Sequence, residues 1–358
     1  MSAPRLLPLL AVATLLVLLL ALALLAARQG TPALAAHIGF ALGVMPLILA
    51  AMSYFVPVLT RGDGAGAAAW LPPLLALAGG ILLVAALGTD YSNVVVSLAA
   101  LLALGAALGL AAWAMHRTRR MVGRRHPGID WYFAALGMLL LALFAVLAMP
   151  WFPDQRAQLR LFHLHANLLG FVGLTALGTL RVLLPTCLGL ADPAAACRLR
   201  RDLKWAVAGS LLIAIGASSL LPAALAAAAT PLAAVGGLLY IAVVLRMLIE
   251  WIGGFRGALL APHGAAASLL AAVLGLGCLL LLSLPHGLGY LSGRAAVAGF
   301  VIAFLLPLVS GAAAQLLPIW LRPGVQGPWH VQLRRRLSRW SALRGFALLL
   351  AGLLLTVV

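Results

Sequence analysis

Three histidines stand near the starts of two long apolar segments, at matching distances from a proline that ends each segment. His37 lies 20 residues before Pro57, and His165 lies 20 residues before Pro185, with His163 two residues earlier. Imidazole nitrogens ligate iron, copper and zinc alike. Histidines held at one depth by two helices could therefore hold a metal ion or a haem.

A third apolar segment has the same length and ends at Pro318, but alanines occupy the corresponding positions. Ala298 lies 20 residues before this proline and Ala296 lies 22 residues before it, so the three segments share one register. At about 1.5 Å per residue, 20 residues of helix span about 30 Å, the thickness of the hydrocarbon core of a bilayer. We therefore expect repeated membrane helices, with histidines near one face and prolines near the other.

The histidine pair of the sixth apolar run and a histidine in a later loop add candidate ligands. Residues two apart on a helix are separated by about 200° around its axis, so His163 and His165 cannot easily share one ion. The pair suits two neighbouring sites, or one site and a supporting role. We expect His37, His163 and His165 to bind the cofactor, and these three with His286 to be candidate metal ligands. An interfacial hydrogen-bonding role is the alternative for His37.

The composition is that of an integral membrane protein. Hydrophobic residues make up 65% of the chain and charged residues 9%, and the mean hydropathy is +1.13. Eleven apolar runs are long enough to span a bilayer, and they leave no room for a soluble domain. The runs are 5–27, 34–60, 68–88, 91–115, 130–150, 158–185, 203–222, 229–252, 264–284, 293–320 and 341–358.

The spacing of the three terminal prolines predicts the architecture. They end the second, sixth and tenth runs and are 128 and 133 residues apart. We therefore expect one all-α transmembrane domain over 1–358, built from four-helix units at about 1–128, 129–258 and 259–358, the last unit lacking one helix. Pro46 and Pro307 each lie 11 residues before a terminal proline and are expected to kink their helices alike, whereas Leu174 takes this place in the sixth run.

The net charge of +17 indicates topology more than a nucleic-acid partner. Eighteen of the 24 lysines and arginines fall in loops that follow even-numbered runs. By the positive-inside rule these loops are cytoplasmic, which places the N-terminus inside and the C-terminus outside. The expected partners are the lipid bilayer and its anionic headgroups on the cytoplasmic side. The segment 329–340, WHVQLRRRLSRW, is expected to lie along that surface as a short amphipathic helix.

The sequence HLHANLLGFVGLTALGTLRVLLPTCLG resembles the helix of the NnrS family that begins with an HxH pair and ends at a proline. Three four-helix units with histidines on the second and sixth helices are more distantly similar to subunit I of the haem-copper oxidase superfamily. The resemblance implies a pinwheel of helices in a bacterial inner membrane, with haem or copper bound. It places His37 at a low-spin haem ligand position, and His163 or His165 at a haem or copper position. It also implies nitric oxide or redox stress response, or the handling of haem or copper, with an unknown redox partner.

Departures from the superfamily pattern argue against an enzyme. The tenth run has Ala296 and Ala298 and no histidine, the seventh has no His-His pair, and no tyrosine follows the histidines of the sixth. A complete oxygen- or nitric-oxide-reducing centre cannot be built from these residues. A small-solute transporter using polar groups such as Asn167, and a scaffold without cofactor, remain alternatives.

Two charged groups inside the apolar runs have expected structural roles. Glu250 is expected to pair with Arg246 one turn away, and the side chain of Arg181 is expected to snorkel to the membrane interface.

Overall fold

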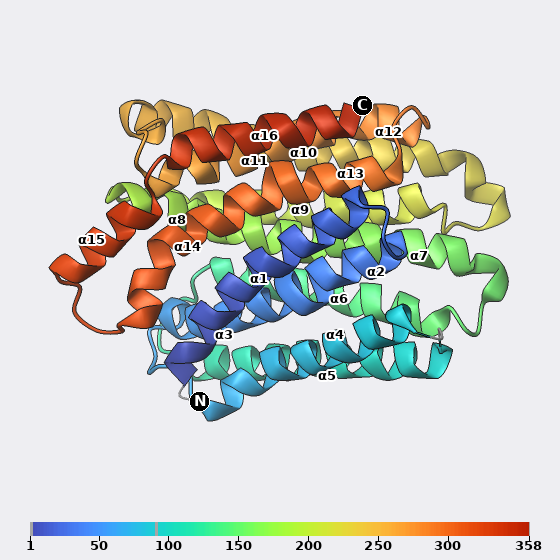
Figure 1. The fold of residues 1–358 in the computed structure, drawn as a ribbon, viewed down its shortest axis with the longest axis horizontal. Coiled ribbons are helices and arrows are strands. Elements are labelled where there is room, and N and C mark those ends of the chain that lie inside the picture. The colour runs from blue at the N-terminus through green and yellow to red at the C-terminus, as the bar shows by residue number, and fades with distance from the viewer. Residues whose placement is uncertain (1–2, 90–91, 358) are drawn as a thin grey trace. The chain divides into compact units, whose positions relative to one another are not determined.

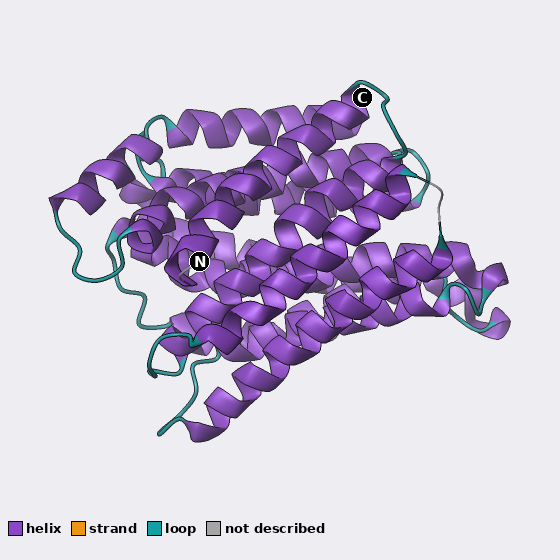
Figure 2. Cartoon of the chain, turned by 60° about the horizontal axis from the view of Figure 1, so that its bottom comes forward, coloured by secondary structure: helices purple, strands orange, loops and turns teal. Residues whose placement is uncertain are grey.

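The computed structural model describes residues 3–89 and 92–357, and all regular structure in these ranges is helical (Figures 1 and 2). The α-helices are α1 (Ala3–Ala26), α2 (Pro32–His37), α3 (Met45–Leu59), α4 (Leu71–Gly88), α5 (Asn93–Arg120), α6 (Gly128–Ala148), α7 (Arg156–His165), α8 (Leu174–Leu188), α9 (Ala195–Ser218), α10 (Ala229–Leu259), α11 (Ala265–Leu281), α12 (Ser283–Gly287), α13 (Gly293–Gly299), α14 (Leu306–Leu321), α15 (Pro328–Leu337) and α16 (Ser341–Val357). Three π-helices, η1 (Ile38–Val44), η4 (Ala166–Gly173) and η6 (Phe300–Leu305), and three short 3₁₀ turns, η2 (Ala67–Trp70), η3 (Pro153–Gln155) and η5 (Ala223–Ala228), complete the list.

Nine helical stretches of the described chain are long and apolar enough to cross a membrane. Helices are the expected solution, because hydrocarbon offers no partner for backbone N–H and C=O groups. The all-helical, polytopic fold class is therefore confirmed. Two of the eleven expected spans fall outside the nine, since α9 begins with a run of charged residues and α11 has only 17 residues. The count of eleven and the four-helix repeat remain predictions.

The helices pack into two compact units. One consists of 12–178 with 196–236, and the other of the described residues in 1–11, 179–195 and 237–358. The chain passes from one unit to the other within α1, α8 and α10, and at the start of α9. The histidine pair described below lies wholly in the first unit.

Helix α6 packs closely against the sixth membrane segment in the first unit. A Cβ built on Gly170 would lie 2.7 Å from Met138 Cβ, and one on Gly178 would lie 2.6 Å from Trp131 Cβ. The indole of Trp131 also donates a hydrogen bond to the carbonyl of Leu199 on α9, at 3.0 Å. These glycines serve close helix packing, as expected from the small residues of the segment.

Small residues also build the core of the second unit. Ala271 of α11, Ala303 of η6 and Leu349 of α16 are buried together. A Cβ built on Gly352 of α16 would lie 2.5 Å from Ala303 N, and one on Gly275 would clash with the Ala303 carbonyl. Close backbone approach of this kind provides van der Waals contact where lipid removes the hydrophobic driving force between helices.

Three of the membrane helices change from α to π geometry part of the way along. The π segments begin one residue after His37, one residue after His165 and two residues after Ala298. The irregularity therefore occurs at the same level in all three segments of the expected repeat.

The prolines explain two of the three π segments. Pro46 and Pro307 are each the second residue of the α-helix that resumes after the π segment. A proline has no N–H and clashes with the carbonyl four residues earlier, and a wider turn relieves both problems. At the two prolines where kinks are expected, the structure therefore has π turns. The third π segment ends before Leu174, so it forms without a proline.

Candidate histidine site

The structure brings His37 and His163 side by side. Their ring centroids are 6.3 Å apart and their planes differ by 21°. His37 is the last residue of α2, and His163 lies in the last turn of α7, so each ring stands where its helix passes into a π segment. Both residues are partly buried in the same unit.

Each ring is held by a backbone carbonyl at one nitrogen. His37 Nδ1 lies 2.7 Å from the carbonyl oxygen of Ala33, and His163 Nδ1 lies 2.9 Å from that of Ala142 on α6. A carbonyl only accepts, so each Nδ1 carries a hydrogen, and the neutral imidazole then has its lone pair at Nε2. Metal-ligating histidines are commonly oriented by such a bond on the far nitrogen.

Asn167 is a second polar residue on the His163 ring. Its amide nitrogen donates to the carbonyl of His163 at 2.8 Å, and it lies 3.3 Å from Nδ1 and 3.5 Å from Nε2 of that ring. The amide therefore fixes the backbone of His163 and touches the ring itself. Its location near the histidines follows from the sequence, since it stands one turn after His163.

The separation of the two rings fits a metal ion between them. An imidazole nitrogen lies about 2.0–2.1 Å from a metal that it ligates and about 1 Å from its own ring centre, so two rings on opposite sides of an ion have centroids about 6 Å apart. The observed centroid distance of 6.3 Å is close to this value, and the two rings are stacked, with planes 21° apart. The imidazole nitrogens are donors of the type that iron and copper accept.

The other expected ligands have separate surroundings. His165 Nδ1 lies 2.9 Å from the Leu161 carbonyl of its own helix. His286 belongs to the other unit, where its Nδ1 lies 2.9 Å from the Leu291 carbonyl. No three His, Cys, Asp or Glu residues gather as a metal site anywhere in the described ranges. The structure therefore pairs His37 with His163, and ligation by His165 and His286 remains a prediction.

The glycines near the pair fill contacts between helices. A Cβ on Gly43 would lie 2.7 Å from Val17 Cγ2, and one on Gly39 would lie 3.2 Å from Leu18 Cδ2. A Cβ on Gly170 would likewise meet Met138 of α6. At these positions, packing against neighbouring helices is the observed role.

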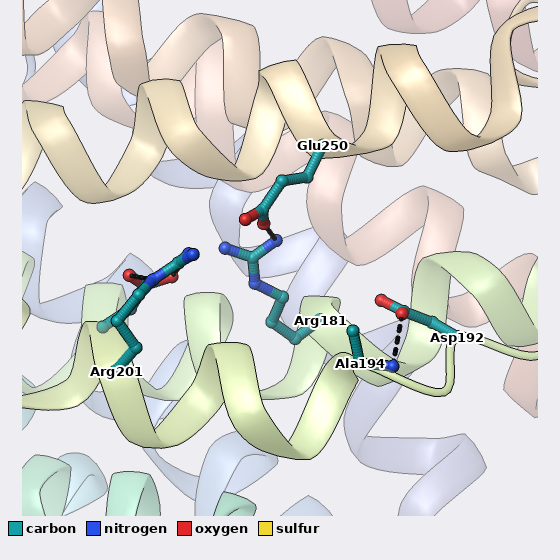
Figure 3. A network of polar contacts seen from close by, with 6 residues as sticks. Arg181, Asp192, Ala194, Arg201 and Glu250 are labelled. Atoms are coloured by element: carbon teal, nitrogen blue, oxygen red, sulfur yellow. Dashed lines mark hydrogen bonds and ion pairs between the residues drawn. The ribbon is translucent and has the colours of Figure 1, made fainter.

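A buried ion pair forms a second polar centre, in the other unit (Figure 3). Arg181 of α8 is 2% exposed, and its Nη1 donates to Glu250 Oε2 of α10 at 2.5 Å. The expectation that Arg181 snorkels is therefore wrong. Sequence reasoning missed this pair because its partners are 69 residues apart, whereas Arg246 stands one turn from Glu250.

Comparison with known proteins adds no family to this geometry. No family model, no curated protein and no solved structure matches the chain. A functional assignment therefore depends on the residues of the chain and on how the structure places them.

Proposed function

We propose that the chain is a haem-binding membrane protein in which His37 and His163 would hold the haem iron. The observation that carries the proposal is the pair of imidazoles, each anchored through Nδ1 to a carbonyl, with centroids 6.3 Å apart. Two protein donors suffice for a haem iron, because the macrocycle brings four nitrogens of its own. The lack of a third donor among the described residues therefore favours haem over an ion held by protein alone.

The chain's own groups would hold and tune the site. The carbonyls of Ala33 and Ala142 accept hydrogen bonds from the Nδ1 hydrogens. These bonds fix the tautomer and make the lone pair of each Nε2 a stronger ligand for a metal. Asn167 holds the backbone of His163 in place. Held by these two histidines, a haem would supply one-electron transfer. The NnrS resemblance assigns this chemistry to nitric oxide or redox stress response, or to haem or copper handling.

Copper is the second candidate, and the same observation supports it. Two imidazoles on opposite sides of an ion also suit a single copper, since imidazole is a ligand that copper accepts readily. Haem and copper differ in what the site must supply, because a copper ion brings no equatorial ligands. His165 is the nearest further imidazole in the sequence, so a copper site predicts that it takes part.

The membrane orientation belongs to the same proposal. The arginine-rich loops after even-numbered spans would face the cytoplasm and contact anionic headgroups, which places the histidine pair near the outer face of an inner membrane. This side suits exchange of electrons or of haem with partners outside the cytoplasm.

Absorption spectra and metal analysis of single-histidine variants test the proposal. Protein produced with ample haem and copper should show a Soret band, and reduction should sharpen its visible bands. His37→Ala and His163→Ala should each abolish or shift the spectrum, whereas His116→Ala, an exposed control on α5, should leave it unchanged. One copper per chain, lost in the same variants and in His165→Ala, would select copper. Purified protein with neither cofactor would leave the transporter or scaffold interpretation.

A further inference from the structure

A surface on the second unit, which we call the arginine face, lies on α15 and the turn after it. Gln332, Arg335, Arg336 and Arg339 are all exposed and follow the spacing i, i+3, i+4, i+7. These positions share one side of a helix. The expected short amphipathic helix is therefore present at Pro328–Leu337, with a strongly cationic outer side.

The opposite side of α15 is fixed to the protein. His330, Leu333, Arg334 and Leu337 have the same i, i+3, i+4, i+7 spacing and are buried or partly buried. Both ring nitrogens of His330 bond to backbone, since Nδ1 accepts from Gly327 N at 3.0 Å and Nε2 lies 2.8 Å from the Arg322 carbonyl. The preceding loop is consequently folded back against the helix.

The end of α15 is also tied down, by the loop between α10 and α11. Ser338 Oγ donates to the His263 carbonyl at 3.1 Å, and Trp340 N donates to His263 Nδ1 at 3.1 Å. The arginine face is therefore held in place from both ends.

Nothing in this part of the chain neutralises these charges. After Glu250 the sequence contains eight arginines and no aspartate or glutamate. Like charges three or four residues apart on a helix repel each other. Arg339 stands at these distances from Arg336 and Arg335, so their repulsion is unfavourable unless a counter-charge is bound. The positive charge of the exposed arginines therefore indicates an external, acceptor-rich anion.

Exposed apolar side chains beside the arginine face indicate the source of that anion. Leu321, Val325, Trp340 and Leu343 are all more than half exposed, and Val325 is 98% exposed. A soluble anion gains no favourable contact from apolar side chains. An interfacial helix, in contrast, combines basic residues with apolar groups that reach the acyl chains of the lipid. We infer that the arginine face binds the phosphate of anionic phospholipids, with these apolar side chains against the acyl chains.

Lipid titration tests this inference independently of haem. The protein would be placed in nanodiscs of phosphatidylcholine, and phosphatidylglycerol would be titrated in while the bound lipid is counted by native mass spectrometry. Each exposed arginine is worth about fivefold in affinity for an anionic surface. The double variant R335Q/R336Q should therefore bind about 25-fold more weakly, and R335K/R336K should keep most of the binding because it keeps the charge.

A matched pair of exposed arginines supplies the control. R28Q/R160Q changes two exposed arginines of the other unit that lie outside the arginine-rich loops, so it removes the same charge and should leave the α15 site intact. Circular dichroism checks that every variant keeps its helix content. Equal loss in the control and the α15 variant, or binding by R335Q/R336Q within twofold of wild type, would overturn the inference. Occupation by inorganic phosphate in pure phosphatidylcholine discs would overturn it in favour of a free anion.

Discussion

The buried pair of Arg181 and Glu250 allows a quantitative test of the second unit. The guanidinium nitrogen and the carboxylate oxygen are 2.5 Å apart, and Arg181 is 2% exposed. Two unit charges about 4 Å apart attract by about 4 kcal/mol at an effective dielectric constant of about 20. Removing one partner of a buried ion pair costs about 3–5 kcal/mol in comparable proteins.

We therefore expect Glu250→Leu to lower the free energy of unfolding by about 3–5 kcal/mol, and Arg181→Met to do the same. The double variant R181M/E250L should be within about 1 kcal/mol of wild type or more stable, because apolar replacement of a whole buried pair is often neutral or stabilising. The two single effects should thus be strongly non-additive. Reversible unfolding in mixed micelles, followed by circular dichroism, measures all three.

The exposed pair of Arg125 and Asp130 is the matched control. Its atoms are 2.7 Å apart, but its side chains are 51% and 26% exposed. Such a pair contributes about 0.2–1 kcal/mol, because water screens it. Should Glu250→Leu cost no more than Asp130→Asn, or should the single effects add, the reasoning from burial would be refuted.

Four further predictions follow from other parts of the chain. His126 has its pKa lowered by burial and by the positive charges of Arg200 and Arg61, and its Nδ1 accepts from Gly128 N. The unfolded chain therefore binds this proton more readily, so stability should fall as the pH drops below about 6.5, and H126Q should weaken that dependence in melting curves at pH 8 and pH 5. Gly178→Ala places a Cβ against Trp131 and should cost about 1–3 kcal/mol, whereas Gly137→Ala has open space and should be neutral or stabilising. The exposed thiol of Cys197 should react with an impermeant maleimide only in inside-out vesicles, and labelling in right-side-out cells would reverse the proposed orientation. Asn167→Ala should weaken cofactor binding less than His163→Ala, and an equal loss would make Asn167 a direct ligand.

Much of the fold follows from the apolar runs, whereas the side-chain contacts between helices do not. Every expected span overlaps a helix of the described chain, because a long apolar run must pair its backbone polar groups internally. The shared depth of the three segments stays a prediction, although the π segments begin within one residue of the same distance from the three terminal prolines. The position of a residue around its helix was not predictable from this spacing, and for this reason His163, rather than His165, stands beside His37.

Contacts between residues distant in the sequence could not be predicted. The partner of Arg181 was missed because Glu250 is distant in sequence, and a near neighbour offered a plausible alternative. The short length of α11 and the charges at the start of α9 show where hydropathy is a weak guide to spanning. The amphipathic helix near residue 330 was predictable, whereas its attachment to the loop at His263 needed the fold.

The three π segments have a consequence for the history of the chain. A π turn takes one more residue than an α turn, so each segment is equivalent to a one-residue insertion into an older helix. An insertion that came before duplication would be inherited by every copy at the same site, even where no proline now requires it, as before Leu174. Deleting a single residue from any one π segment should then restore a continuous α-helix. It would also turn the preceding part of the helix by about 100°. In the segment that contains His37, that rotation would carry His37 away from His163.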